Sequence, residues 1–214
     1  MLYFANKNNM RTNKYVKIAV LVSGGGTNLQ ALIDACNNGI IKSGKISIVI
    51  SSNPNAYALQ RAQNANIQTA VVSKKDCTSQ DEFENNIIRY LQDNDIDLIV
   101  LAGFMCILSE SFTKKYKERI INVHPSLIPS FCGKGFYGLH VHEAALEYGV
   151  KITGATVHFV NEIPDGGKII LQKSVAIRKN DTPKSLQRRV MEQAEWKILP
   201  RAVELVSKDI LLNN

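Results

Sequence analysis

Two side chains suited to acyl or proton transfer, Asn122 and His124, lie two positions apart in residues 119–129 (RIINVHPSLIP). The apolar run before them predicts a strand, in which residues two apart share a face. Pro125 keeps His124 extended and ends the strand there. Near neutral pH an imidazole can donate or accept a proton, and an amide N–H can hydrogen-bond a developing oxyanion. We expect this pair at the ligand-binding edge of a sheet; a histidine merely tied to a carbonyl is the alternative.

A carboxylate that could serve this histidine is Asp165, which precedes Gly166 and Gly167 between two predicted strands at 151–160 and 168–177. An Asp-Gly-Gly sequence also makes a good turn, without any catalytic role. As part of a site, Asp165 could orient or deprotonate the histidine. His158 lies on the first of these strands, and it is either a supporting residue near the site or a hydrogen-bonded core histidine.

A glycine-rich loop, residues 23–28 (SGGGTN), joins a predicted strand at 15–22 to a segment with helical spacing. Its glycines allow positive φ and close approach to a ligand. We expect Thr27 or Asn28 to cap the helix, whose free N–H groups and dipole favour an anion. The spacing matches neither a dinucleotide fingerprint nor a P-loop, so it favours a single phosphate. A plain turn between strand and helix is the alternative.

Apolar runs alternate with helical spacing along the chain, which predicts βαβ units with right-handed crossovers. The expected fold class is α/β: a Rossmann-like, mostly parallel sheet flanked by helices, with a C-terminal antiparallel strand pair. Ser79 with Glu82 resembles a capping box, Ser109 is expected to cap the next helix, and Asp181 or Thr182 the last, with a bend near Pro200. The remaining expected strands are 45–51, 67–73, 97–102 and 119–123, and the helices are 56–64, 79–92, 109–116, 140–148 and 181–212.

Length and composition predict one domain at residues 15–214 behind a flexible lead-in at residues 1–14. The 214 residues are 45% hydrophobic and 21% charged, as in ordinary globular proteins. No apolar run approaches the roughly 18 residues of a membrane span, and residues 1–14 lack the apolar core of a signal peptide. The four cysteines are far apart in sequence and fit reduced thiols. We therefore expect a cytoplasmic protein without a membrane partner.

Neither nucleic acid nor a metal ion is expected as a partner. The net charge is +7, but the basic residues are dispersed and lack interleaved aromatic residues. An ordinary solvated surface, with room for a local anion site, explains them better than a polyanion partner. His140 and His142 precede Glu143, but residues i and i+2 do not share a helix face and no third ligand is evident. These polar residues are expected at a helix start or against a ligand.

Five motifs together resemble the phosphoribosylglycinamide formyltransferase family, the folate-dependent formyltransferases of purine biosynthesis. The resemblance covers residues 16–206, and five motifs in order are highly specific where any one of them is modest. They are residues 23–29 (SGGGTNL), 101–105 (LAGFM), 122–127 (NVHPSL), 156–160 (TVHFV) and 165–167 (DGG).

The resemblance implies formyl transfer from 10-formyltetrahydrofolate, a co-substrate, to glycinamide ribonucleotide, without a metal cofactor, in a monomer or homodimer. Its site residues would fall into three groups. The catalytic residues would be Asn122, His124 and Asp165; the ribonucleotide would contact Gly26, Thr27, Asn28 and Glu195; and folate would contact Met105, Cys106, Ile107, Leu108 and Asn122 and the loop at 161–165. In the chemistry that this implies, Asn122 and a protonated His124 stabilise the oxyanion, and Asp165 keeps the imidazole charged.

The sequence departs from the family pattern at three places. Cys106 stands where arginine is common, Gln80 stands near an arginine of some members that meets the folate tail, and the loop at 132–138 is longer than in the shortest members.

Three other functions compete with this interpretation. A methionyl-tRNA formyltransferase would need a C-terminal RNA-binding domain and usually has alanine at Pro125, and a formyltetrahydrofolate deformylase would need an N-terminal regulatory domain. A non-catalytic phosphosugar-binding module would leave the catalytic residues without a role.

Overall fold

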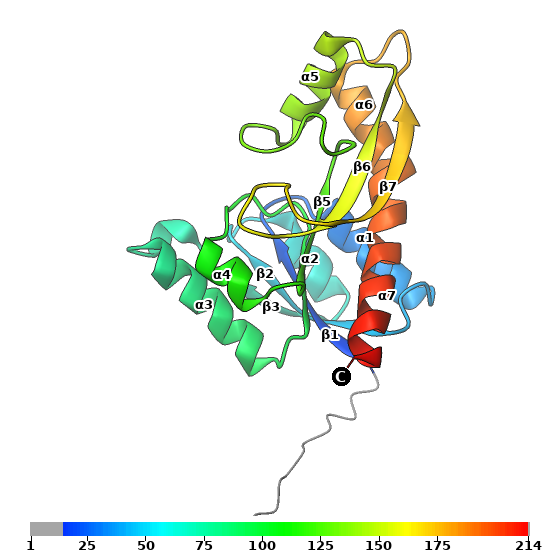
Figure 1. The fold of residues 1–214 in the computed structure, drawn as a ribbon. Helices are drawn as coiled ribbons and strands as arrows, with labels where there is room; N and C mark the ends of the chain where they lie inside the picture. The colour runs from blue at the N-terminus through cyan, green and yellow to red at the C-terminus, as the bar shows by residue number, and fades with distance from the viewer. Residues whose placement is uncertain (1–14, 214) are drawn as a thin grey trace, which may run out of the picture.

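The computed structural model describes residues 15–213, in which one seven-stranded sheet has the order β3-β2-β1-β4-β5-β6-β7 (Figure 1). The first five strands are parallel, and the last two are antiparallel to their neighbours. This confirms the expected fold class. The strands are β1 (Val16–Val22), β2 (Gly44–Ser51), β3 (Gln68–Val71), β4 (Leu98–Leu101), β5 (Ile120–His124), β6 (Ile152–Phe159) and β7 (Ile169–Ala176).

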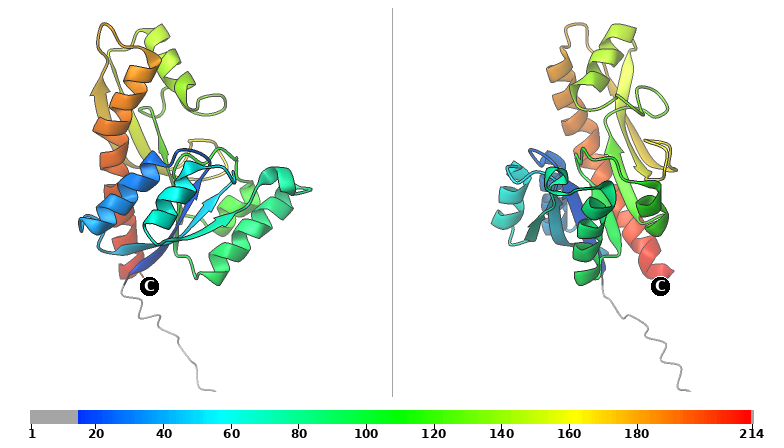
Figure 2. Two further views of the ribbon diagram at one scale, coloured as in Figure 1. Left: turned by 180° about the vertical axis from the view of Figure 1, so that it is seen from behind. Right: turned by 90° about the vertical axis from the view of Figure 1, so that its left-hand side faces the viewer.

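Helices cover both faces of the sheet and run beside the β6–β7 hairpin (Figure 2). Two short irregular turns accompany them: the 3-10 turn η1 (Lys74–Asp76) and the π-turn η2 (Met191–Glu195). The expected lead-in at residues 1–14 lies outside the described residues. The helices are α1 (Thr27–Asn37), α2 (Tyr57–Asn64), α3 (Gln80–Asp93), α4 (Glu110–Lys115), α5 (Leu139–Tyr148), α6 (Pro183–Val190) and α7 (Trp196–Leu212).

Alternate residues of the central strands supply two separate cores, one on each face of the sheet. In β1, Ile18 and Val20 pack in the core that includes α1 and α7, whereas Ala19 and Leu21 pack in the core that includes α3. All four side chains are at most 1% exposed. A strand covered on both faces is apolar throughout, which explains the unbroken apolar runs of the sequence.

The antiparallel hairpin sets the register that matters for the site. β6 pairs with β5 so that Asn122 lies opposite His158 and His124 lies opposite Thr156. Gly167 closes the β6–β7 connection, where a Cβ would lie 1.7 Å from the carbonyl oxygen of Phe159. Only glycine permits that approach, so the Gly-Gly pair after Asp165 fixes how the connecting loop folds back.

The predicted helix starts are partly confirmed. Ser79 and Ser109 cap α3 and α4, and Thr182 caps α6 in a full capping box. Glu82 does not complete the box expected with Ser79, because its carboxylate accepts hydrogen bonds from the backbone and hydroxyl of Thr78 instead.

One expectation about the start of a helix is wrong. Neither Thr27 nor Asn28 caps α1: the N-cap is Gly26, and no side chain caps it. In the last helical stretch a bend was expected near Pro200, but the irregular backbone lies elsewhere. α7 continues through Pro200, and the irregular turn is η2, ahead of it.

Within residues 15–213, no helix is both long and apolar enough to cross a bilayer. The same residues contain no cluster of three potential metal ligands drawn from His, Cys, Asp and Glu. All four cysteines are free thiols, as expected.

Candidate active site

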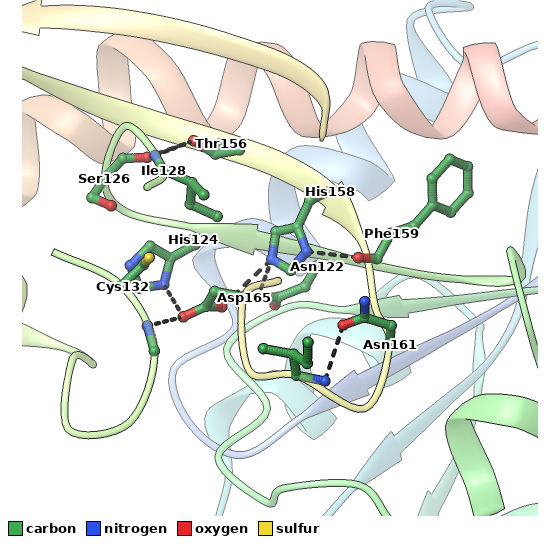
Figure 3. A network of polar contacts seen from close by, with 12 residues as sticks. Asn122, His124, Ser126, Ile128, Cys132, Thr156, His158, Phe159, Asn161 and Asp165 are labelled. Carbon is green, nitrogen blue, oxygen red and sulfur yellow. Dashed lines mark hydrogen bonds and ion pairs between the residues drawn. The ribbon is translucent and has the colours of Figure 1, made fainter. Parts of the chain in front are cut away.

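Four polar side chains from three segments meet at the end of β5 (Figure 3). The carboxylate of Asp165 lies between two histidine rings, with Oδ2 3.4 Å from Nδ1 of His124 and Oδ1 3.5 Å from Nε2 of His158. Nδ2 of Asn122 lies 3.3 Å from the same Nε2 of His158. His124 therefore contacts Asp165 directly, and Asn122 is joined to them through His158, whose role the sequence left undecided.

Asp165 is held in place by its backbone and by a neighbouring loop. Its φ of 56° lies in the left-handed region, which a residue without a glycine's freedom rarely adopts. The N–H of Gly133 donates a 2.8 Å hydrogen bond to Oδ2. Burial raises the pKa of this carboxyl, but the hydrogen bond from His158, the charge of His124 and the Gly133 N–H outweigh it and lower the pKa below its ordinary value. Asp165 is therefore an anion at neutral pH.

His124 is buried, with 5% of the residue exposed, and both of its ring nitrogens have neighbours. Nε2 lies 2.9 Å from the carbonyl oxygen of Phe131, and since a carbonyl only accepts, Nε2 carries a proton. Burial lowers the pKa of this imidazole, and the opposing effect of Asp165 is smaller. Burial therefore lowers the pKa more than Asp165 raises it, and the charged ring expected during the reaction stays a prediction.

His158 supports the site as well as the core. It is 1% exposed, and its Nδ1 lies 2.8 Å from the carbonyl of Phe159, so Nδ1 carries a proton. Nε2 is then free to accept from Asn122, whereas a proton on Nε2 would be shared with Asp165. This ring thus fixes the amide of Asn122 and the carboxylate of Asp165 relative to each other.

The glycine loop exposes backbone N–H groups at the start of α1. Gly26 has φ 71°, and a Cβ there would lie 2.6 Å from Cβ of Ala58, so glycine is required. α2 braces the loop, because Ala58 N–H donates to the carbonyl of Gly24 and Arg61 Nε donates to that of Gly25. Since no side chain caps α1, its first N–H groups remain available to an anion.

Asn28 and Glu195 are 167 positions apart in sequence, yet Asn28 Nδ2 donates a 2.7 Å hydrogen bond to Glu195 Oε2. Burial raises the pKa of Glu195 to about 7, against the smaller opposing effect of this hydrogen bond. Oδ1 of Asn28 is buried and has no partner in the described part of the chain. Glu195 ends the π-turn η2, and such turns are frequent at functional sites. The pair leaves one acceptor and one titratable acid beside the glycine loop.

The segment at 105–108 joins the glycine loop through Ser23, whose hydroxyl accepts a 2.9 Å hydrogen bond from Met105 N–H. Met105 and Ile107 are 57% and 72% exposed, whereas Cys106 and Leu108 are partly buried against the core. Two exposed apolar side chains beside a polar site suit the flat, apolar face of a heterocyclic ligand.

His142 is a buried residue near the site whose position sequence reasoning did not find. It is fully buried in α5, and neither ring nitrogen has a partner among the described residues. Burial, assisted by the nearby charge of His124, lowers its pKa to about 4. Its spacing from His140 suggested a helix start or a ligand contact, because sequence does not show which ring is buried.

Carboxylate, imidazole and amide groups within contact of one another suit acyl transfer, in which an oxyanion forms and protons move between two nitrogens. Comparisons with known proteins agree with this chemistry. Residues 16–203 match the family described as formyl transferase. A phosphoribosylglycinamide formyltransferase of Haemophilus influenzae is 45% identical over 188 residues, which cover 88% of this chain and 85% of the relative.

A larger human protein, trifunctional purine biosynthetic protein adenosine-3, is 45% identical over 194 residues, or 91% of this chain and 18% of its own length. The crystal structure of glycinamide ribonucleotide transformylase 1 from Symbiobacterium toebii has a TM-score of 0.86 at 37% identity, covering 96% of this chain and 94% of that one. The chain thus belongs to the formyl transferase family, and within it to the phosphoribosylglycinamide formyltransferases, which are enzymes of purine biosynthesis.

Proposed function

We propose that residues 15–214 form one domain that transfers the formyl group of 10-formyltetrahydrofolate to the amine of glycinamide ribonucleotide. The observation that carries the proposal is the carboxylate of Asp165 between His124 and His158, with Asn122 bonded to the same His158 ring. A plain turn would not require an aspartate with positive φ to be buried against two histidines.

In the proposed reaction the amine nitrogen of the ribonucleotide attacks the formyl carbon, and the C=O electron pair moves onto oxygen. The amide N–H of Asn122 and the Nε2–H of His124 hydrogen-bond this oxyanion. The C=O then re-forms, the bond between the formyl carbon and the folate nitrogen breaks, and that nitrogen gains a proton. The proton comes from the attacking amine by way of Asp165. One such donor is worth about 3–4 kcal/mol in comparable sites.

His124 must exchange one partner for another in this scheme. Its Nε2–H meets the Phe131 carbonyl here, so the oxyanion replaces that carbonyl when the reaction begins. Burial lowers the pKa of this ring, so the charged form depends on its two partners. A negative oxygen at Nε2 and the Asp165 carboxylate at Nδ1 together favour the imidazolium as charge develops.

The substrates have separate binding regions in this proposal. The N–H groups of Gly26, Thr27 and Asn28 would bind the ribonucleotide phosphate, and Glu195 would contact the same substrate. Met105, Cys106, Ile107 and Leu108, with Asn122, would bind folate. No step uses a metal ion or nucleic acid, and we place the reaction in the cytoplasm, in a monomer or homodimer.

The test is formation of tetrahydrofolate from the formyl donor, followed by absorbance with and without glycinamide ribonucleotide. We expect turnover only when the ribonucleotide is present. Turnover without it would indicate a deformylase, and no turnover with bound ribonucleotide would indicate a binding module. Charged initiator tRNA serves as a second acceptor, and formylation of it in preference to the ribonucleotide would also contradict the proposal.

A further inference from the structure

A buried acid outside the catalytic group holds the segment at 105–108 by its backbone. Glu84, in the second turn of α3, is 3% exposed. Its Oε1 accepts a 2.6 Å hydrogen bond from the N–H of Ser109, and its Oε2 accepts one from the hydroxyl of Ser109. A carboxylate buried in this way is retained only where its partners compensate for lost hydration.

Gln80 extends this contact by one residue. Its Nε2 donates to Oε1 of Glu84 at 2.6 Å and to the carbonyl oxygen of Ile107 at 3.1 Å. Gln80 and Glu84 are one helical turn apart on α3. In the loop between β4 and α4 they therefore hold the carbonyl oxygen of Ile107 and the N–H of Ser109. Met105 N–H, bonded to Ser23, holds the other end of the segment.

The peptide groups between these anchors remain open. Within residues 15–213, the N–H groups of Cys106, Ile107 and Leu108 have no hydrogen-bond partner. Three open donors in succession, flanked by fixed ends and by the exposed side chains of Met105 and Ile107, form a preorganised edge that a planar, hydrogen-bonding ligand can meet.

We propose that Glu84 is a positioning residue for the folate substrate, acting through Ser109 and, with Gln80, through Ile107. The inference rests on the proposed function, because it assigns the edge at residues 106–108 to the folate ring. Glu84 does not touch the reacting atoms. Its effect falls on folate affinity and spares both the ribonucleotide and the chemical step.

The experiment compares Glu84→Ala with the wild-type chain and with Glu82→Ala. Glu82 is the matched control, since it also accepts two hydrogen bonds at the start of α3 but contacts only Thr78. We expect Glu84→Ala to raise KM for the folate donor about tenfold or more, as for loss of a preorganised binding segment. KM for the ribonucleotide and kcat should stay within twofold, and Glu82→Ala should leave all three unchanged.

Two milder variants cover the case in which Glu84→Ala does not fold. Glu84→Gln keeps an oxygen for the Ser109 N–H and should raise the folate KM only a few-fold. Gln80→Ala, at the start of α3, should also weaken folate alone. Equal loss of both substrates, or unchanged folate KM in the folded variants, would overturn the inference.

A measurement without ligand separates this inference from the proposed function. Hydrogen exchange at the Ser109 amide should accelerate at least tenfold in Glu84→Ala and remain unchanged in Glu82→Ala. If the wild-type chain transfers no formyl group, the proposed function fails whatever the exchange shows. If transfer occurs but Ser109 exchange is unaltered, the positioning role of Glu84 fails by itself.

Discussion

The parallel and antiparallel parts of the sheet provide different kinds of atoms to the site. At the end of β1 the glycine loop provides backbone N–H groups, held by Gly26 and the bracing contacts of α2. At the ends of β5 and β6 the site consists of side chains, and their positions depend on the β5–β6 pairing and on the loop that carries Asp165. We therefore expect an added side chain to disrupt the glycine loop. At the ends of β5 and β6, we expect a change of chemical group to disrupt the site.

The largest expected effect is on the side-chain part. Asp165→Asn keeps the shape but removes the charge beside His124, which lies 3.4 Å away. Loss of an orienting carboxylate beside a catalytic histidine lowers kcat by about 10⁴ in a comparable triad. We expect a decrease of about 10³–10⁴ in kcat with the ribonucleotide Kd within twofold, measured by steady-state kinetics and calorimetry. Asp209→Asn, on the exposed face of α7, is the control; near-normal turnover in Asp165→Asn would remove the residue from the mechanism.

The second effect separates Asn122 from its neighbours. Asn122→Ala removes one proposed oxyanion donor and leaves Nε2 of His158 without its amide partner. Removing a single donor of this kind lowers kcat by about 10²–10³. Single-turnover kinetics should show the loss in the chemical step. A change confined to folate KM would mean that Asn122 serves binding alone.

The third effect tests the backbone part. In Gly26→Ala the new Cβ would lie 2.6 Å from Cβ of Ala58, and the native fold would require the alanine to adopt a φ of 71°. Left-handed backbone costs an alanine about 1–2 kcal/mol, before the clash is counted. We expect a roughly tenfold higher KM for the ribonucleotide, by loss of aligned N–H groups, with folate KM little changed.

The control for Gly26→Ala is Gly24→Ala, since a Cβ at Gly24 meets no heavy atom within 4 Å. Thermal unfolding should show a lower midpoint for Gly26→Ala and almost none of that loss for Gly24→Ala. Equal behaviour of the two variants in kinetics and unfolding would argue against a special backbone role for Gly26.

The last effect is on stability rather than on kinetics, and it acts through Glu195. Its pKa rises from 4.5 to about 7 on burial. Because the folded pKa lies above the unfolded one, the neutral acid contributes its stability below pH 4.5 and loses it as pH rises through 7. Relative to Glu195→Gln, the free energy of unfolding should fall by about 3 kcal/mol between pH 4 and 8.

Urea unfolding at several pH values measures this difference between the wild-type chain and Glu195→Gln. His124 affects stability in the opposite direction, because its lowered pKa makes it destabilising as pH falls. Since both variants contain His124, its contribution cancels in their difference. A difference that does not vary with pH would show that burial leaves the pKa of Glu195 at its unfolded value.

Elements and local chemistry were largely predictable, because they depend on short-range patterns. Apolar runs located the ends of every strand to within two residues, and Ser79, Ser109 and Thr182 cap the expected helices. The capping of α1 was mispredicted, since Thr27 and Asn28 have the right chemistry but Gly26 occupies the N-cap. Local propensity could not show that Asn28 is drawn to Glu195 instead.

Residue types along the chain thus determined the fold class, the glycine loop and the pairing of Asn122 with His124 on one face, because strand alternation and glycine freedom act over a few residues. Only the tertiary structure decided that Asp165 reaches both histidines, that His158 belongs to the site, and that Glu84 holds the segment at 105–108. Burial also decided that the pKa of His124 is lowered and that the pKa of Glu195 rises to about 7. Contacts and desolvation depend on distant segments, and no local pattern records them.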